Sequence, residues 1–305
     1  MSESPITYRR ARESDAERTF EIVQEAAGDL NRKMGRPVAP ALPASRVIRF
    51  RHFCVRYDGE RFWVAEDGDL MVGAAYATLR DDVWYLAALH VLPDYQGRKI
   101  GTELIKRTLS GTRPSTALTV LTDAMNPVSN GLYLRHGMLP QDSTLTFDGA
   151  IGAADGAGHG AGMFATRPID LAHDLGTLAG LDLGAVGFAR PTDHEFWTGV
   201  PGLTGVILED EGSVQGYAYV SAAGAIGPVA VTRPEDLTPA LDAAAAIASD
   251  AGATTLHVRV DGSARHASDW AVKRGLLLTG IGLMLSSRPV GRLDRYVTSG
   301  ADALY

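Results

Sequence analysis

Residues 89–101 read Leu-His-Val-Leu-Pro-Asp-Tyr-Gln-Gly-Arg-Lys-Ile-Gly, and this stretch decides the fold. It ends a run of β-branched and aromatic residues, which favours a strand over 82–91. Apolar residues then recur at helical spacing over 100–108, and Gly111 follows as a stop signal. The stretch therefore predicts a strand that passes through a glycine-containing loop into the N-terminus of a helix.

This loop has the chemistry of a phosphate site. Unsatisfied backbone N–H groups and the helix dipole make a helix N-terminus attractive to anions. Gly97 and Gly101 allow a phosphate to approach the backbone closely, and Arg98 and Lys99 add positive charge. A strand, the sequence Gln-Gly-Arg and a helix in this order are more specific than a single glycine turn, and together they indicate a pyrophosphate cradle.

The composition limits the classes of protein that the chain can be. Its 305 residues suggest two domains of ordinary size. Its 29 Lys and Arg against 36 Asp and Glu leave a net charge of −7, which disfavours a nucleic-acid-binding protein. A single cysteine, Cys54, excludes an internal disulfide. Without an apolar N-terminal segment or a membrane-length apolar run, we expect a cytoplasmic protein that needs no membrane.

The first half of the chain predicts an α+β domain. Short strands, helices and turns are expected in the order β-α-α-β-β-β-α-β-α-β-β, which is typical of a mostly antiparallel sheet with helices on its faces. Residues 144–147 and 162–166 are interpreted as a closing hairpin joined by the glycine-rich segment 149–162. The basic stretch 46–56 is interpreted as a solvated face, although a place in an acceptor pocket is open to it.

The second half repeats this pattern. One offset of 138 residues aligns Val91 with Val229 and Gly137 with Gly275, and 183–190 alternates like the first strand, 6–10. We therefore expect domains at 1–168 and 169–305. At the same offset, the Gln-Gly-Arg stretch becomes Pro234-Glu235-Asp236, so two carboxylates would replace the phosphate site. The second domain is expected to neither bind the ligand nor catalyse.

The stretch at 89–101 resembles the acyl-CoA-binding motif of the GNAT acyltransferases, with Lys99 where that family usually has glycine. A second stretch, 122–138, resembles the family's Asn…Leu-Tyr-x-x-x-Gly-Phe signature. The resemblance implies two tandem GNAT-like domains, each a mixed, mostly antiparallel sheet flanked by helices. It also implies an N-acyltransferase that uses acetyl-CoA as co-substrate.

The resemblance assigns roles to residues of the first half. Tyr133 would be the general acid that protonates the departing CoA thiolate, and Asn126 would lie near the pantetheine arm. Backbone N–H groups near 89–91 would stabilise the oxyanion. The expected acyl-CoA-binding residues are Leu89, His90, Val91, Gln96, Gly97, Arg98, Lys99, Ile100, Gly101, Thr102, Asn126 and Ser129.

Several points stay open at this level. His90, Asp123 or a water path are alternatives for the general base, and the histidines show no metal-ligand spacing. The acceptor can be a small amine, an antibiotic amine, a peptide N-terminus or a lysine, and the protein can be a monomer or a homodimer. Rival functions are an acyl-CoA sensor without turnover and, with less support, an enzyme resembling mycothiol synthase, whose working site lies in the C-terminal domain.

Overall fold

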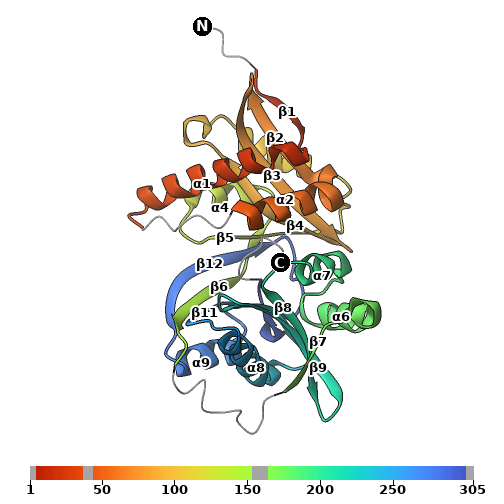
Figure 1. Ribbon diagram of the computed structural model, residues 1–305. Coiled ribbons are helices and arrows are strands. Elements are labelled where there is room, and N and C mark those ends of the chain that lie inside the picture. The colour runs from red at the N-terminus through yellow and green to blue at the C-terminus, as the bar shows by residue number, and fades with distance from the viewer. Residues whose placement is uncertain (1–4, 37–43, 153–163, 300–305) are drawn as a thin grey trace. The chain divides into compact units, whose positions relative to one another are not determined.

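The computed structural model describes residues 5–36, 44–152 and 164–299, apart from the side chains of 44–46. The chain divides into two compact units. The first comprises Met1–Val120 and Val128–His136, and the second comprises Leu121–Pro127 and Gly137–Tyr305. Figure 1 labels most of the elements along the chain.

The sheet of the first unit begins with an antiparallel meander, as the sequence predicts. The strands run in the order β1–β2–β3–β4–β5, and the last pair, β4 with β5, is parallel. Their bounds are β1 (Thr7–Arg10), β2 (Phe62–Asp67), β3 (Leu70–Arg80), β4 (Val83–Val91) and β5 (Ala117–Asp123).

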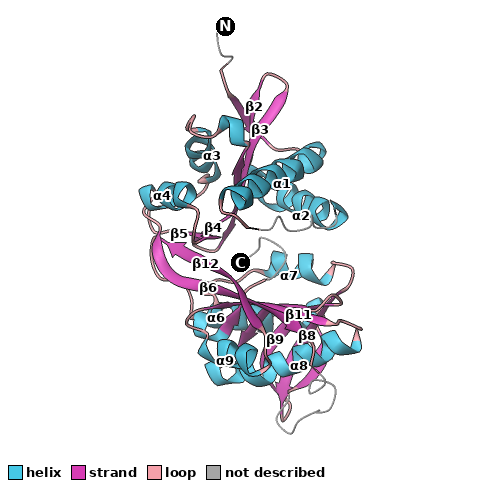
Figure 2. Ribbon diagram, turned by 90° about the vertical axis from the view of Figure 1, so that its left-hand side faces the viewer, coloured by secondary structure: helices cyan, strands magenta, loops and turns pink. Residues whose placement is uncertain are grey.

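Helices cover both faces of this sheet. Figure 2 shows α1 and α2 on one side of the strands and α3 and α4 on the other. Their bounds are α1 (Ala16–Lys33), α2 (Ala44–Asp58), α3 (Ile100–Thr108) and α4 (Pro127–Arg135). The basic stretch 46–56 lies within α2, and it is more than a solvated face, because Arg51 and the aromatic side chains Phe50 and Phe53 are buried.

The second unit has a larger mixed sheet. Its strands lie in the order β12–β6–β11–β13–β10–β9–β8–β7. The strands are β6 (Leu139–Ala150), β7 (Ala165–Pro168), β8 (Leu203–Asp210), β9 (Ser213–Ser221), β10 (Ala225–Val231), β11 (Thr255–Asp261), β12 (Leu277–Ser286) and β13 (Tyr296–Val297). The helices are α6 (Leu171–Ala185), α7 (Pro191–Thr198), α8 (Leu237–Asp250) and α9 (Arg265–Lys273).

Two local expectations are wrong. The segment at 144–147 does not pair with the described part of 162–166, because β6 pairs with β11 and β12 while β7 pairs with β8. Residues 153–163, which include most of the expected connection, lie outside the described residues. Residues 183–190 are not a strand, because Leu183 lies in α6 and a turn follows that helix. Alternation of side chains does not identify the partner strand, which explains the first error. Over a few residues it also does not exclude the end of a helix and a turn, which explains the second.

The structure shows the repeat clearly. β5, α4 and β6 each begin 138 residues before β11, α9 and β12. An ion-pair motif repeats as well: Arg9 of β1 binds Asp15 and Glu66, and Arg167 of β7 binds Asp174 and Glu209. The second copy therefore begins at β7. The expected domain boundary at 168 stays a prediction, and the compact units place 137–168 with the second copy.

The fixed offset fails at one place. A short 3-10 helix, Pro93–Tyr95, precedes α3, and its counterpart, Pro234–Asp236, precedes α8. Residues 96–99 separate the first 3-10 helix from α3, whereas α8 begins directly at Leu237. The sequence comparison suggested that Glu235 and Asp236 replace part of Gln-Gly-Arg, and this is wrong. The loop that would hold the phosphate is missing from the second copy.

The core of the second unit lies on one face of its sheet. Apolar residues of β8, β9 and β10 that alternate toward one face pack against α8 and α9, and among them are Val206, Ala218 and Val229.

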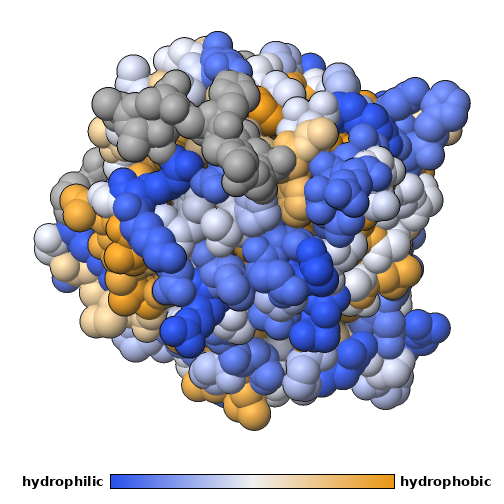
Figure 3. Space-filling model, turned by 90° about the horizontal axis from the view of Figure 1, so that it is seen from below, coloured by the Kyte–Doolittle hydropathy of each residue, from blue (hydrophilic) through white to orange (hydrophobic). Residues whose placement is uncertain are grey.

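Figure 3 shows a mostly hydrophilic surface with apolar side chains gathered at its edges. Within the residues that the structure describes, no helix is long and apolar enough to cross a membrane, and no cluster of His, Cys, Asp and Glu could hold a metal ion.

Candidate functional site

The parallel pair at the end of the first sheet separates before its strands end. β4 pairs with β5 from Val83 to Leu86, and the ladder goes no further although β4 continues to Val91. On its other side β4 stays paired with β3, with an irregularity between Leu86 and Ala88. In the described chain, the β5-facing edge of residues 87–91 therefore presents backbone N–H and C=O groups without a partner strand. A ligand with amide groups can pair with such an edge.

The loop after this edge is held in a defined shape. Gln96 donates a hydrogen bond from Nε2 to the carbonyl oxygen of Val91, 3.0 Å away, which ties the loop to the end of β4. Gly97 has a φ of +81°, a left-handed conformation that glycine adopts without steric cost. Gln96, Gly97, Arg98 and Lys99 are all exposed, so the loop offers its groups to solvent.

Lys99 stands where the motif that this loop resembles usually has glycine. It is the N-cap residue of α3 and has a φ of +62° and a ψ of +9°, in the left-handed region. Glycine is the residue best suited to that conformation, because a Cβ there costs about 1–2 kcal/mol. Lysine accepts this strain and brings a cation to the helix N-terminus.

Gly101 lies in the first turn of α3, where α4 and β4 come close. A Cβ built on Gly101 would lie 3.6 Å from Cδ2 of Leu132 and 3.8 Å from Cδ2 of Leu89. These are ordinary contact distances, so packing within the protein would admit a methyl group. Ile100 anchors the turn because it is almost completely buried. Thr102 follows in the same turn and is half-buried.

Tyr133 comes from α4, next to the Leu132 that contacts Gly101. It is 5% exposed, and burial, with a smaller effect of Tyr85, raises the pKa of its hydroxyl well above the usual value. The hydroxyl therefore keeps its proton at neutral pH. Packing thus connects the helix that carries Tyr133 to the first turn of α3.

Two other predicted residues lie near the start of α4. Ser129 is half-buried in its first turn. Asn126 precedes the helix, and its backbone N–H donates to the carbonyl oxygen of Asp123 at 3.2 Å. Asn126 belongs to residues 121–127, which group with the second unit. Its place beside the pantetheine arm stays a prediction.

His90 of β4 is partly buried. Desolvation and the nearby Arg51 guanidinium lower its pKa to about 4, so its imidazole is uncharged at neutral pH. Arg51 is itself 2% exposed and comes from α2. Neighbouring residues of a strand point to opposite faces, and Leu89 contacts the α3 side, so His90 lies on the face that α1 and α2 cover.

The corresponding parallel pair of the second unit is filled by the chain itself. β10 pairs with β11 at Ile226 and its neighbour Ala225, and further along β13 lies between them. Val297 of β13 pairs with Val229 of β10 and with Val260 of β11. Two residues of the chain's own backbone thus occupy the counterpart of the open edge. The second copy of the tyrosine is Ala271, which is completely buried in the core.

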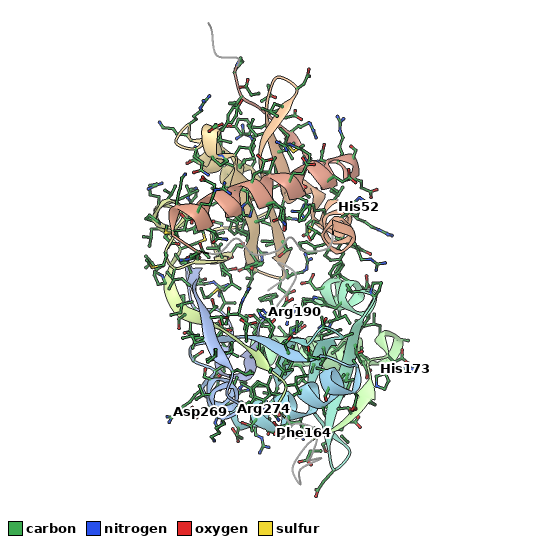
Figure 4. The ribbon with its side chains drawn as sticks, turned by 60° about the vertical axis from the view of Figure 1, so that its left-hand side comes forward. His52, Phe164, His173, Arg190, Asp269 and Arg274 are labelled. Carbon is green, nitrogen blue, oxygen red and sulfur yellow. The ribbon has the colours of Figure 1, made fainter. Side chains whose placement is uncertain are left out.

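A buried polar cluster supports that strand. Arg190, labelled in Figure 4, donates from Nη1 to the hydroxyl of Tyr296 in β13 at 2.9 Å. Its Nε donates to Asp182 at 3.1 Å, and Asp182 also accepts a hydrogen bond from the hydroxyl of Tyr217 and pairs with Nε2 of His194. Arg190, Asp182 and His194 are all fully buried. Sequence reasoning missed this cluster and β13. Its members are spread between Asp182 and Tyr296, and residues so far apart in the chain give no local signal of contact.

Comparisons with known proteins agree with this geometry. Residues 24–138 match the model of the acetyltransferase (GNAT) family. Among solved structures, a Pyrococcus horikoshii protein has a TM-score of 0.74 and 18% identity, with 97% of this chain and 95% of that one covered.

Two further structures cover nearly the whole chain. The GCN5-related N-acetyltransferase of Sphaerobacter thermophilus has a TM-score of 0.62 and 15% identity, with 95% and 99% covered. A tandem GNAT protein from the clavulanic acid biosynthesis pathway has a TM-score of 0.60 and 15% identity, with 93% and 99% covered. A search of curated proteins gave no match. The predicted fold, two tandem GNAT-like domains, is confirmed.

Proposed function

The chain carries a GNAT acetyltransferase domain, and on that premise we propose that it moves an acetyl group from acetyl-CoA to an amine, with the working site in the first unit. One observation carries the proposal. The open edge of β4 at 87–91 leads through the short 3-10 helix Pro93–Tyr95 into the loop 96–99 and the N-terminus of α3. A long ligand with amides at one end and phosphates at the other fits that order of groups.

The residues divide the binding of acetyl-CoA among them. The free backbone of β4 would pair with the amide groups of the pantetheine arm. The N–H groups at the start of α3 would bind the pyrophosphate, with Arg98 and Lys99 adding charge. Gly97 and Gly101 leave the backbone uncovered where the phosphates approach. Because the cations are exposed, salt should weaken binding.

The reaction needs one proton donor on the sulfur side. The acceptor nitrogen forms a bond to the thioester carbonyl carbon, the C–S bond breaks, and the sulfur leaves with the electron pair. The Tyr133 hydroxyl would give its proton to that sulfur, and the amine loses a proton to solvent or to a base. Burial keeps Tyr133 protonated, because it raises the pKa of the hydroxyl. Such a general acid contributes a factor of about 10²–10⁴ to the rate.

The second unit supports this assignment by contrast. It has no counterpart of residues 96–99, it has Ala271 in place of the tyrosine, and β13 fills the gap between β10 and β11. Each change removes a different part of the site: the cradle for phosphate, the acid and the free edge. The proposal therefore assigns one acetyl-CoA site to each chain and gives the second unit no catalytic part.

Tyr133→Phe tests the proposed reaction. We expect turnover of acetyl-CoA with an accepted amine to fall by about 10²–10⁴, while the dissociation constant for acetyl-CoA changes little. Thiol release measures the first quantity and calorimetry the second. Tyr57→Phe is the matched control, because Tyr57 is an exposed tyrosine of α2.

The possible results separate the rival functions. Full activity of Tyr133→Phe would show that Tyr133 is not the acid. Binding of acetyl-CoA by the wild type, with no thiol released for any amine, would favour a sensor over an enzyme.

A further inference from the structure

Arg51 is a buried cation without an anionic partner among the described residues. Its Nε donates to Oγ1 of Thr19 at 2.8 Å, and its Nη1 donates to the carbonyl oxygen of Val47 at 3.3 Å. The guanidinium also lies 5.7 Å from the centre of the Phe20 ring. These groups are neutral, and Nη2 donates to none of the described residues. With 2% exposure, water compensates little of the charge.

The other buried arginines of the described chain, Arg80 and Arg190, each bind a carboxylate. Arg80 donates from Nη1 and Nη2 to the two carboxylate oxygens of Asp58, each at 2.9 Å. Arg190 binds Asp182. A buried guanidinium is costly unless a negative group faces it, and both follow that rule. Arg51 does not follow it, so the missing partner requires an explanation.

The position of Arg51 suggests the explanation. Its charge acts on His90, which lies on β4 one position before Val91 and on the face covered by α1 and α2. The same strand carries the open edge proposed for acetyl-CoA. Because α1 and α2 cover this face, a carboxylate would reach the guanidinium by entering between the two helices, where Thr19 of α1 holds Nε of Arg51 of α2.

We propose that Arg51 binds a carboxylate of the acceptor, so that the substrates are small amines that carry a carboxylate, such as amino acids or short peptides. The inference rests on the proposed function. Arg51 is already held at Nε and Nη1 by Thr19 and Val47, so it is positioned before the ligand arrives. A guanidinium is well suited to a carboxylate, and hydrogen bonds between charged groups are about twice as strong as neutral ones.

The direct test compares acids with their amides. Purified protein with acetyl-CoA is offered the common amino acids and glycyl dipeptides, each as the free acid and as the carboxamide, and thiol release is measured. We expect the accepted acids to exceed their amides in kcat/KM by tenfold or more. Preference for free amino acids or for dipeptides then identifies the source of the carboxylate. Equal rates for acid and amide, or turnover of amides alone, would overturn the proposal.

Two variants locate the preference at Arg51. In Arg51→Met the ratio of kcat/KM for acid over amide should fall toward one. The acid loses the guanidinium that binds its carboxylate, and the neutral amide has no such interaction to lose. In Arg51→Lys, which retains the charge, part of the preference should return. A ratio unchanged in Arg51→Met would contradict the proposal, whatever the absolute rates.

Thermal unfolding separates a binding role from a structural one. If Arg51 serves a ligand, Arg51→Met should leave the melting temperature of the free protein unchanged or raised, because an uncompensated buried charge is removed. A clear fall in melting temperature would make Arg51 a structural residue and overturn the proposal.

The proposed function fails separately from this inference. If calorimetry detects no binding of acetyl-CoA, the acetyltransferase assignment itself is wrong. If acetyl-CoA binds and none of the acids is acetylated, the assignment of the acceptor is wrong.

Discussion

The two copies of the fold end their parallel strand pairs differently. In the first unit, β4 and β5 stop pairing at Leu86, and the edge beyond is open. In the second, β13 lies between β10 and β11 and pairs with both. A gap in a sheet leaves backbone groups that must be satisfied by something, and here one gap is filled by the chain itself while the other is left for a ligand. The same fold thus gives a scaffold in one unit and a candidate site in the other.

Two buried arginines, Arg51 of the first unit and Arg190 of the second, differ in the same way. Arg190 is neutralised by Asp182 and holds Tyr296 of the filling strand. Arg51 has two neutral partners and no carboxylate. The buried Arg190 of the second unit thus has a counter-charge within the chain, whereas the buried Arg51 of the unit proposed to act has none among the described residues. Stability and binding therefore make opposite demands on two buried arginines.

The largest effect should come from breaking the paired arginine. Arg190→Met leaves Asp182 buried without its cation, and removing one partner of a buried ion pair costs about 3–5 kcal/mol. The same change at Arg51 should cost nothing or stabilise the free protein. Denaturant unfolding of the two variants against the wild type measures the contrast. Equal destabilisation by both would end the comparison between the two units.

Much of the fold could be predicted from the sequence. Turn residues at 67–68 separate strands of marked β propensity, and the helical spacing after Lys99 predicted α3, with Gly111 as its stop where the structure ends the helix at Thr108. The loop 96–99 could be recognised because its chemistry is local: two features, the glycines and the cations, stand next to each other in the chain. The strands, helices and motif of the first unit are determined mostly by neighbours in sequence.

The rest depends on partners far apart in the chain. β6 continues into the second unit's sheet, between β11 and β12, and nothing in residues 139–150 names those partners. β13 has two residues, too few to show a period. Arg51 looked like one member of a basic stretch, because spacing cannot show that its side chain is buried while Arg56 is exposed. Non-local packing decided each of these points.

Asp261 sharpens the comparison at the end of β11. It is fully buried, and neither carboxylate oxygen has a hydrogen-bond partner among the described residues. Burial raises its pKa well above the usual value, with a further contribution from Asp142. The folded state therefore keeps a proton that the unfolded state releases above pH ~4. For this group, stability is highest at or below that pH and falls as the pH rises.

Asp261→Asn should remove that dependence on pH. The variant carries no titratable group, so at pH 7 we expect it to be more stable than the wild type by about 1 kcal/mol, with the difference shrinking toward pH 4. Unfolding by denaturant at several pH values measures this. Asp269→Asn, an exposed change on α9, is the control. A variant less stable at pH 7 than at pH 4, relative to wild type, would contradict the account.

The smallest effect concerns Lys99, whose counterpart is absent from the second unit. Lys99→Ala and Lys99→Gly both remove the charge, and both should weaken acetyl-CoA binding a few-fold at low salt. Only glycine relieves the left-handed backbone, so Lys99→Gly should be more stable than Lys99→Ala by about 1 kcal/mol. Thermal unfolding compares them. If alanine were the more stable, the conformation assigned to residue 99 would be wrong.

Titration of the protein with acetyl-CoA by calorimetry tests the central claim, that each chain has one site and that it lies in the first unit. We expect one site per chain in the wild type. Gly97→Asp, which places a carboxylate in the exposed loop proposed for the phosphates, should weaken binding by about 10²-fold, from about 3 kcal/mol of repulsion. Gly176→Asp, the same change at an open position of α6, should leave binding intact. Two sites per chain, or one site that Gly97→Asp leaves unchanged, would contradict the account.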